Sequence, residues 1–330
     1  MGKIGIIANP ASGKDIRRLV GQALVIGNQE KINIVKRILV GAQSAGADEI
    51  LLMPDFFGIG KQSVRDLRKS FPEAADRAVF LEMPVTDSGK DSTAAARMMG
   101  ELGADCILTL GGDGTVRVVA KGSGEIPLIP ISTGTNNVIP AFVEGTIAGM
   151  AAGIFSRMPV EKRGVMVERQ KRIDVFVNGK LADIALVDAA VIDNQYIGSR
   201  AVWKPESLLQ VAVTQASPDN IGFTSIIGRY RTVRDIDPFG GSVIIKENGK
   251  CYAVQAAIGP GLIYEVCVDD YQQLDPEKPA AVIEKRPCVI ALDGEREIVL
   301  RKQDSAEFVL DLEGPYFVNI SKVLESTQPE

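Results

Sequence analysis

The sequence predicts an α/β fold: an N-terminal domain with a doubly wound, Rossmann-like parallel sheet, followed by a mostly antiparallel β domain. Two observations support this prediction. Strand-like and helix-like segments alternate in the first half, and hairpin signals replace them in the second. A chain of 330 residues with 45% hydrophobic content is also long enough for two cores, at about 100 to 200 residues per domain. We therefore expect one domain over residues 1–158 and a second over residues 159–314.

Short apolar runs that are typical of buried strands occur in the first half at residues 3–8, 49–53, 78–83, 105–110 and 126–131. Apolar residues recur with helical spacing at residues 15–20, 29–45, about 64–71, about 95–102 and 142–157. Asn28 is placed to cap the second of these helices, and Gly46, Gly103 and Pro159 are placed to end helices. Strands that alternate with helices imply right-handed crossovers and a parallel sheet.

Turn signals of a different kind follow the first domain. Asn178-Gly179 and Asn248-Gly249 each separate two apolar runs, which is typical of two-residue hairpins with type I′ turns. Asp293-Gly294 separates two further runs. Residues 222–228 favour a polar bend between strands, and residues 316–321 favour a final strand. The second domain is therefore expected to be rich in antiparallel strands.

Composition excludes several classes of function. The net charge of −5 counts against nucleic acid or an anionic membrane as partner, because both attract basic patches. No apolar run reaches about 18 residues and the first run is too short for a signal peptide, so we expect a cytoplasmic protein. The sequence has no histidine, which excludes an imidazole base or metal ligand. Widely spaced cysteines within apolar runs predict reduced core residues, at Cys106, Cys251, Cys267 and Cys288.

The most informative stretch is Gly111-Gly112-Asp113-Gly114-Thr115, which follows an apolar run and opens a helical segment. Its glycines allow positive φ and close approach of a ligand, and the first N–H groups of the helix favour a phosphate. A carboxylate at Asp113 would repel a bare phosphate unless it binds a metal ion or takes a proton from an attacking hydroxyl. The combination indicates phosphoryl transfer, although the glycines alone are equally typical of an ordinary turn.

These five residues resemble the signature of the superfamily that joins NAD kinases, diacylglycerol kinases and sphingosine kinases. Residues 9–14 look like the first phosphate-contacting loop of these kinases, and residues 130–137 look like their loop after the next strand. With Val138 and Pro140, the third loop is most similar to the ATP-NAD-kinase-like branch that includes the AcoX protein of acetoin catabolism. Each loop follows the carboxyl end of a predicted strand, where ligands bind in open α/β sheets.

The resemblance implies a set of site residues in a cleft between the two domains. Asp113 is the expected catalytic residue. The expected nucleotide-binding residues are Asn9, Ser12, Gly13, Lys14, Gly111, Gly112, Gly114, Thr115, Ser132, Thr133, Gly134, Thr135, Asn136 and Asn137. The expected acceptor-binding residues are Asp188, Thr224, Ser225, Asp293 and Glu295. As alternatives, the loop after strand 126–131 is a self-bonded polar turn, Lys14 a solvated lysine, and Asp293-Gly294 a plain hairpin turn.

The implied activity is the phosphorylation of NAD to NADP, with ATP or polyphosphate as donor and Mg²⁺ as cofactor. NAD kinases carry an Asn-Glu pair in the acceptor strand, and the matching residues here are Val187 and Asp188. Valine cannot replace the hydrogen bonds of asparagine, which predicts weak binding of NAD. The alternatives are a kinase for another small hydroxyl compound or a lipid, and a non-catalytic nucleotide-binding regulator linked to acetoin catabolism. The resemblance also implies that residues from about 315 to 330 pack on the first domain, and we expect a homo-oligomer.

Overall fold

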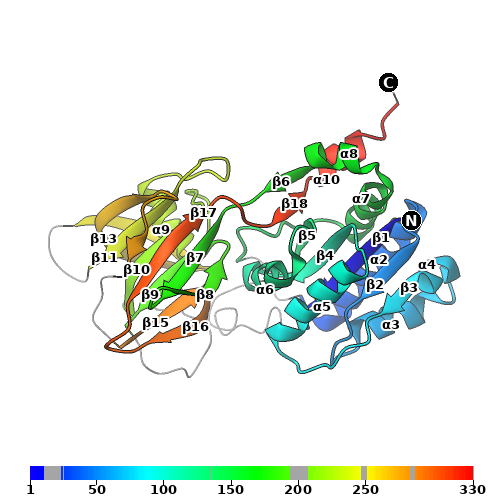
Figure 1. Ribbon diagram of the computed structural model, residues 1–330, viewed down its shortest axis with the longest axis horizontal. Helices are drawn as coiled ribbons and strands as arrows, with labels where there is room; N and C mark the ends of the chain where they lie inside the picture. Colours follow the sequence, from blue (N-terminus) through cyan, green and yellow to red (C-terminus); the bar gives the residue numbers. More distant parts are fainter. Residues whose placement is uncertain are drawn as a thin grey trace.

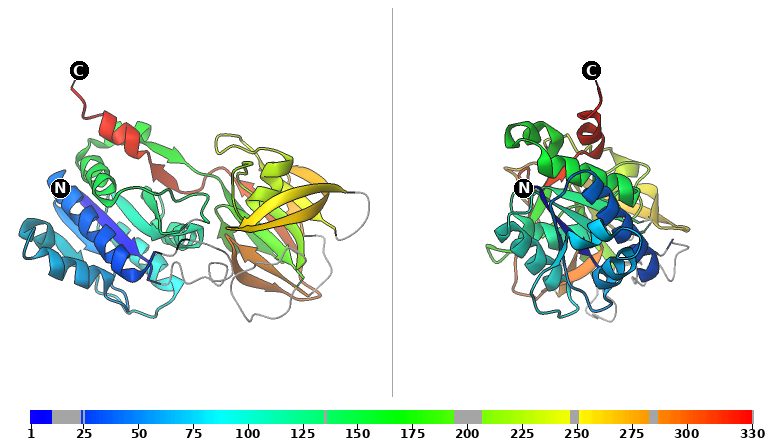
Figure 2. Two further views of the ribbon diagram at one scale, coloured as in Figure 1. Left: turned by 180° about the vertical axis from the view of Figure 1, so that it is seen from behind. Right: turned by 90° about the vertical axis from the view of Figure 1, so that its right-hand side faces the viewer.

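The computed structural model describes residues 1–10, 24, 26–134, 136–193, 207–246, 251–282 and 287–329. Two parts lie side by side along the long axis of the molecule, one with helices around a sheet and one built mainly of strands (Figure 1). Both chain ends lie on the helix-rich part, also when the molecule is seen from behind (Figure 2). Within the described ranges, no helix is long and apolar enough to cross a membrane.

The described part of the first domain contains a seven-stranded sheet with the order β3-β2-β1-β4-β5-β18-β6. Its strands are β1 Lys3–Ala8, β2 Glu49–Leu52, β3 Ala78–Phe80, β4 Cys106–Gly111, β5 Leu128–Ser132, β6 Val167–Arg169 and β18 Tyr316–Val318. Strands β1 to β5 pair in parallel, which confirms the predicted parallel sheet. The chain begins at β1 in the middle and winds outward in both directions, so the carboxyl ends of β1, β4 and β5 lie next to one another.

Helices cover both faces of this sheet, as a doubly wound fold requires. They are α2 Asn28–Ser44, α3 Ile59–Leu67, α4 Pro72–Asp76, α5 Gly89–Glu101, α6 Asp113–Ser123, α7 Gly145–Arg157, α8 Val160–Arg163 and α10 Ile320–Glu325, with a 3₁₀ turn η1 Gly164–Met166. Ile6 packs in the core beneath α2 and α7. Its neighbour Ile7 packs in the core beneath α5 and α6. Successive residues of a strand point to opposite faces, so an all-apolar strand such as β1 supports helices on both sides.

Several predicted boundaries differ from those observed. Gly27 caps α2 and Asn28 is its first residue, so the predicted cap is displaced by one position. The predicted helix over 64–71 is divided, because α3 ends at Leu67 and Phe71 caps the short helix α4. Helix α6 already begins at Asp113, directly after the glycine pair. The predicted helix over 15–20 lies outside the described residues.

The second domain is built from antiparallel sheets, as predicted. Over its described residues, a seven-stranded sheet has the order β12-β13-β11-β10-β9-β15-β16, and a four-stranded sheet has the order β14-β17-β7-β8. The elements are β7 Arg172–Val177, β8 Lys180–Ala185, β9 Asp188–Ile192, β10 Leu208–Val213, α9 Thr224–Tyr230, β11 Gly240–Ile245, β12 Tyr252–Gly259, β13 Leu262–Leu274, β14 Ala280–Ala281, β15 Cys288–Leu292, β16 Glu295–Leu300 and β17 Ala306–Asp311. One core packs Val175 and Phe308 of the smaller sheet with Val191 and Ile290 of the larger sheet.

Two of the three hairpin predictions are confirmed. Asn178-Gly179 joins β7 to β8, and Asp293-Gly294 joins β15 to β16, with positive φ at all four residues. The hairpin predicted around Asn248-Gly249, which lies outside the described residues, is wrong, because β13 lies between β11 and β12 in the sheet. Helix α9 begins within the bend predicted at 222–228. Its N-cap residue Phe223 and its residue Ile226 pack in the core beneath the larger sheet.

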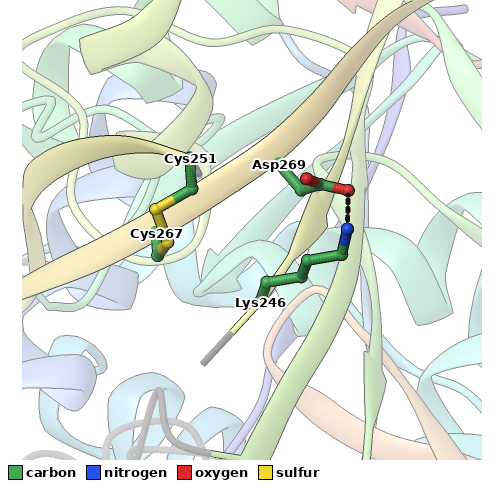
Figure 3. Close-up of a disulfide and its surroundings, with 4 residues drawn as sticks. All are labelled: Lys246, Cys251, Cys267 and Asp269. Carbon is green, nitrogen blue, oxygen red and sulfur yellow. Dashed lines mark ion pairs between the residues drawn. A yellow bond between two sulfur atoms is a disulfide. The ribbon is translucent and has the colours of Figure 1, made fainter. Parts of the chain in front are cut away.

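The expectation for the cysteines is wrong for one pair. Cys251 and Cys267 form a disulfide, with Cα atoms 5.5 Å apart. Cys267 lies on β13 and Cys251 directly precedes the edge strand β12, so the bond ties the edge of the larger sheet (Figure 3). The ion pair of Lys246 Nζ with Asp269 Oδ2, at 2.6 Å, joins the segment after β11 to β13 nearby. Cys106 and Cys288 are buried core residues, as predicted.

The chain passes between the domains at two adjacent places. Gln170 N donates to Pro315 O and Gly314 N donates to Gln170 O, both at 2.9 Å, so the outgoing and returning segments pair with each other. The chain returns to the sheet of the first domain, where β18 pairs with β5 and β6. Within the predicted final strand only residues 316–318 form β18, and α10 follows from Ile320. Because β6 belongs to the first sheet, we draw the boundary between the domains at Gln170 rather than after residue 158.

Candidate phosphoryl-transfer site

Three loops meet at the carboxyl edge of the first sheet. In the parallel register, Ala8 of β1 lies beside Leu110 of β4, and Gly111 of β4 lies beside Ser132 of β5. Asn9 N donates to Leu110 O at 3.2 Å, and Thr133 N donates to Gly111 O at 3.3 Å, which extends both ladders into the loops. The prediction that these loops share one edge of the sheet is confirmed.

The first two loops are joined by a side-chain hydrogen bond. Asn9 Nδ2 donates to Thr115 Oγ1 at 3.1 Å. Thr115 lies in the first turn of α6, folded back over Gly111, where a Cβ atom would overlap the threonine side chain. Gly111 therefore serves close packing, and none of the three glycines has the positive φ that we expected. Gly112 has φ of −101°, and Gly111 and Gly114 are not among the described glycines with positive φ.

Asp113 occupies the first helical position of α6, and its carboxylate joins the second loop to the third. It accepts hydrogen bonds from Val138 N at 3.0 Å (Oδ2) and from Ile139 N at 2.9 Å (Oδ1). These two donors were not predicted, because the residue type does not indicate which backbone N–H groups will donate a hydrogen bond. They hold the carboxylate at the positive end of the helix, where a phosphate would also be favoured.

The third loop also contains internal hydrogen bonds, as expected for the self-bonded polar turn that was the alternative to a binding loop. Ser132 Oγ donates to Gly134 O at 2.7 Å, and Asn137 Nδ2 donates to Ser132 Oγ at 2.7 Å. Thr133 is buried. Four of the predicted nucleotide-binding residues, Ser12, Gly13, Lys14 and Thr135, lie outside the described residues.

Lys31 is a site residue that the sequence pattern did not reveal. It lies in the first turn of α2 and is 0% exposed. Its Nζ donates to Asn9 O at 2.8 Å and to Pro10 O at 3.4 Å. A buried ammonium group thus holds the beginning of the first loop from the side opposite to Thr115. On a helical wheel a single lysine is usually assigned to the solvated face, so no sequence signal indicated this contact.

The Asp293-Gly294-Glu295 turn brings the second domain to the same helix. A Cβ atom built at Gly114 would lie 3.3 Å from Glu295 Oε1, so this carboxylate lies against the start of α6. Asp188 is held beside the turn, since Asp293 N donates to Asp188 O at 2.9 Å and Asp188 N donates to Asp293 Oδ1 at 3.2 Å. The structure therefore brings Asp188, Asp293 and Glu295 together, near the predicted catalytic loop.

The Asp293 carboxylate organises the start of β9. It accepts hydrogen bonds from Val187 N at 2.8 Å and from Leu186 N at 3.1 Å, in addition to the bond from Asp188. Burial raises the pKa of Asp293, against the opposing influence of Arg117 and these backbone donors. The carboxylate oxygens of Asp293 are therefore occupied by structural hydrogen bonds. Asp293 is part of an ordinary hairpin turn, as the alternative stated, and this turn lies beside the site.

Thr224 and Ser225 were expected to bind the acceptor, but the structure does not place them among the residues described above. Both are buried on α9, where Thr224 Oγ1 donates to Ile221 O at 3.4 Å and Ser225 Oγ donates to Gly222 O at 2.6 Å. Their hydroxyl groups satisfy backbone carbonyls that precede the helix, which is the ordinary local role of serine and threonine. We therefore do not retain them as acceptor-binding residues.

The described residues contain no group of three or more aspartate, glutamate or cysteine side chains that could hold a metal ion alone. Mg²⁺ in phosphotransferases usually takes one or two carboxylates and completes its shell with water and substrate phosphates. The carboxylates of Asp113 and Glu295 at the start of α6 fit this sparse arrangement. They do not fit a protein-only metal cage.

Comparisons with known proteins agree with the observed fold. A profile of the ATP-NAD kinase N-terminal domain matches residues 4–158. Yeast NADH kinase, solved in complex with NADH, has a TM-score of 0.53 at 13% identity, covering 100% of this chain and 89% of that one. A putative diacylglycerol kinase from Bacillus anthracis str. Sterne has a TM-score of 0.50 at 14% identity, covering 96% and 97%. These structures share the fold, and with the matched domain they support a kinase-type phosphotransferase as the class of protein.

The family is defined more narrowly by a close relative. A profile of the acetoin catabolism protein X C-terminal domain matches residues 171–313. Acetoin catabolism protein X of Cupriavidus necator is 37% identical over 314 residues, which cover 93% of this chain and 87% of the relative. The chain belongs to the acetoin catabolism protein X family. Both the superfamily and the branch inferred from the three loops are confirmed.

Proposed function

We propose that the protein transfers the terminal phosphoryl group of ATP to a hydroxyl group of a small-molecule acceptor, with NAD as the first candidate. One observation carries this proposal: loops from β1, β4 and β5 converge on the N-terminus of α6, and Glu295 of the second domain meets that helix at Gly114. A nucleotide bound there would have its phosphates at helical N–H groups, with the acceptor between the two domains.

The protein would act mainly by alignment and charge stabilisation, because phosphoryl transfer demands little covalent chemistry. Lys31 and Thr115 hold Asn9 and so fix the first loop for the phosphates. In this proposal Asp113 lies where the acceptor hydroxyl arrives, and its carboxylate would take the hydroxyl proton or help to hold Mg²⁺. Mg²⁺ bound to the nucleotide supplies neutralisation of the phosphate charge.

NAD is proposed with weak affinity. The residue that corresponds to the asparagine of NAD kinases is Val187, whose side chain is 1% exposed and whose N–H is used by Asp293. It can offer a dinucleotide no polar contact. Losing such a contact usually costs about 1 to 3 kcal/mol. Another small hydroxyl compound is therefore the second candidate acceptor.

The test is to incubate the protein with Mg²⁺, γ-labelled ATP or polyphosphate, and NAD or a panel of sugars and polyols, and to follow transfer of the label. We expect a labelled product, and we expect Asp113→Asn to lower turnover by at least ~10²-fold, the scale for a positioned acid–base group. Binding of ATP by this variant, measured by isothermal titration, should persist because the helical N–H groups are unchanged.

Two results would contradict the proposal. Binding of ATP without transfer to any acceptor would favour a regulatory nucleotide-binding protein. Near-normal turnover of Asp113→Asn would remove this aspartate from the mechanism.

A further inference from the structure

Arg117 of the first domain is buried against carboxylates of the second domain. It lies one turn after Asp113 on α6 and is 1% exposed. Its Nη2 donates to Glu297 Oε1 at 2.8 Å, its Nη1 is 3.3 Å from Asp183 Oδ2, and its Nε is 3.5 Å from Asp293 Oδ2. Glu297 lies on β16, Asp183 on β8, and Asp293 in the turn before β16.

The energetic cost of burying the charged Arg117 side chain is offset by these partners. Burial disfavours the charged guanidinium, but Asp293, Asp183 and Glu297 outweigh this effect and raise the pKa of Arg117. An arginine keeps its charge when it is removed from water, so carboxylates are needed to compensate for the lost hydration. The docked position of the two domains is therefore linked to this one side chain.

The contact with Asp293 connects Arg117 to the acceptor side of the site. The same Asp293 carboxylate accepts the N–H groups of Leu186, Val187 and Asp188. The Leu186 side chain, in turn, packs in the first-domain core together with Val116, which directly precedes Arg117. Helix α6, the Asp293 turn and the start of β9 thus form one connected unit.

We propose that Arg117 is a positioning residue that sets the distance between the phosphoryl-transfer loop and the acceptor-binding strand. It acts through Asp293 and touches neither substrate. The expected effect of Arg117 on turnover rests on the proposed function. Its expected effect on the Asp293 turn does not. Without the guanidinium, the Asp293 turn and the amides that it holds are released from α6, and the acceptor is misaligned with the bound nucleotide.

The kinetic test compares Arg117→Lys with Lys121→Met. Lys121 lies one turn further along α6 and pairs with Asp183 across the same boundary, at 2.8 Å, but it is half-exposed and its ion pair does not involve Asp293. We expect Arg117→Lys to lower kcat/KM for the acceptor by at least ~10-fold, because small misplacements of reacting groups are costly. The dissociation constant for ATP should change by less than about threefold, since a point-charged lysine leaves the phosphate loops intact. Lys121→Met should leave both values unchanged.

A second measurement keeps the inference testable if no acceptor is found. Amide hydrogen exchange in Arg117→Lys should accelerate by at least ~10-fold at Leu186, Val187 and Asp188, whose N–H groups depend on Asp293. Exchange at these amides should be normal in Lys121→Met. Normal exchange in Arg117→Lys would overturn the inference whatever the activity, as would a kinetic loss confined to the affinity for ATP. Absence of phosphoryl transfer by the wild type, with accelerated exchange in the variant, would contradict the proposed function alone.

Discussion

Lys31 illustrates what a single buried side chain does at this site. Its ammonium group is removed from water and donates to carbonyl oxygens at the start of the first loop. Asp113 is similar in being buried and bonded to backbone groups, yet its place beside the three loops was predictable from the glycines that surround it. Lys31 belongs to no recognisable motif in α2, so only the fold connects it to Asn9.

We predict that Lys31→Met lowers the free energy of unfolding by about 1 to 3 kcal/mol, because the Asn9 and Pro10 carbonyls lose a buried donor. ATP should also bind more weakly, since the first loop loses its support. The matched control is Lys36→Met on the same helix, whose Nζ is 3.8 Å from Asp66 Oδ2 at the surface. That pair should contribute less than about 1 kcal/mol. Urea unfolding and isothermal titration measure both effects, and equal losses in the two variants would contradict the prediction.

At the scale of elements, β4 and α6 are held together by close packing between the end of the strand and the first turn of the helix. Gly111 ends β4, and Thr115 of α6 folds back over it to receive the hydrogen bond of Asn9. The unit needs a residue without Cβ at position 111, although the backbone there is not left-handed. The motif was recognisable from the sequence, but the reason for its first glycine was not.

We therefore predict that Gly111→Ala destabilises the protein by about 1 to 3 kcal/mol, the cost of overpacking a tight site. It should also weaken the binding of ATP, because displacement of Thr115 releases Asn9. Gly164→Ala is the control, since Gly164 has φ of −57° and no described atom lies within 4 Å of the position that a Cβ atom would take there. Thermal unfolding of both variants gives the comparison. If Gly111→Ala leaves the unfolding temperature unchanged, the prediction is contradicted, because Thr115 can then rotate away freely.

The edge of the larger sheet carries a second prediction at this scale. The Cys251–Cys267 disulfide closes a segment with a sequence separation of 16 residues, which corresponds to a stabilisation of up to about 3 kcal/mol. The double change Cys251→Ser and Cys267→Ser should lose this amount in urea unfolding, and reduced wild type should match the variant. Phosphoryl transfer should be unaffected, because β12 lies at the edge of the sheet opposite to β16. Identical stability of oxidised and reduced wild type would contradict the pairing.

At the scale of the whole molecule, the chain connects the two domains twice, at Gln170 and at Gly314. These two covalent connections lie side by side (Figures 1 and 2). Lys171 fixes this junction to the second domain. Its Nζ donates to the backbone carbonyls of Arg234, Asp237 and Phe239 at 2.8 to 2.9 Å. Burial lowers the pKa of Lys171 to about 8, against the influence of Asp237 and Asp235.

This shift predicts how stability depends on pH. The ordinary pKa of 10.5 applies to the unfolded chain and a pKa of about 8 to the folded chain, so the unfolded state binds more protons between these values. The contribution of Lys171 is therefore complete above the unfolded pKa and is lost as pH falls toward about 8. The stability of wild type relative to Lys171→Met should rise by about 1 kcal/mol from pH ~8.5 to ~9.5. Urea unfolding at several pH values tests this, and a constant difference would contradict it.

The sequence by itself determined most strands and helices of the first domain and the place of the glycine-rich loop, because strand and helix periodicity, hairpin dipeptides and glycine spacing are local properties of the chain. It indicated Asp113, the convergence of three loops at one sheet edge, and the hairpin at Asp293. Only the tertiary structure decided what these residues contact. The β13 strand separates β11 from β12, Cys251 meets Cys267, and Arg117 and Lys31 are buried against distant partners. Such contacts depend on the packing of segments far apart in the chain, where the charge and spacing of a residue carry no information about its partner.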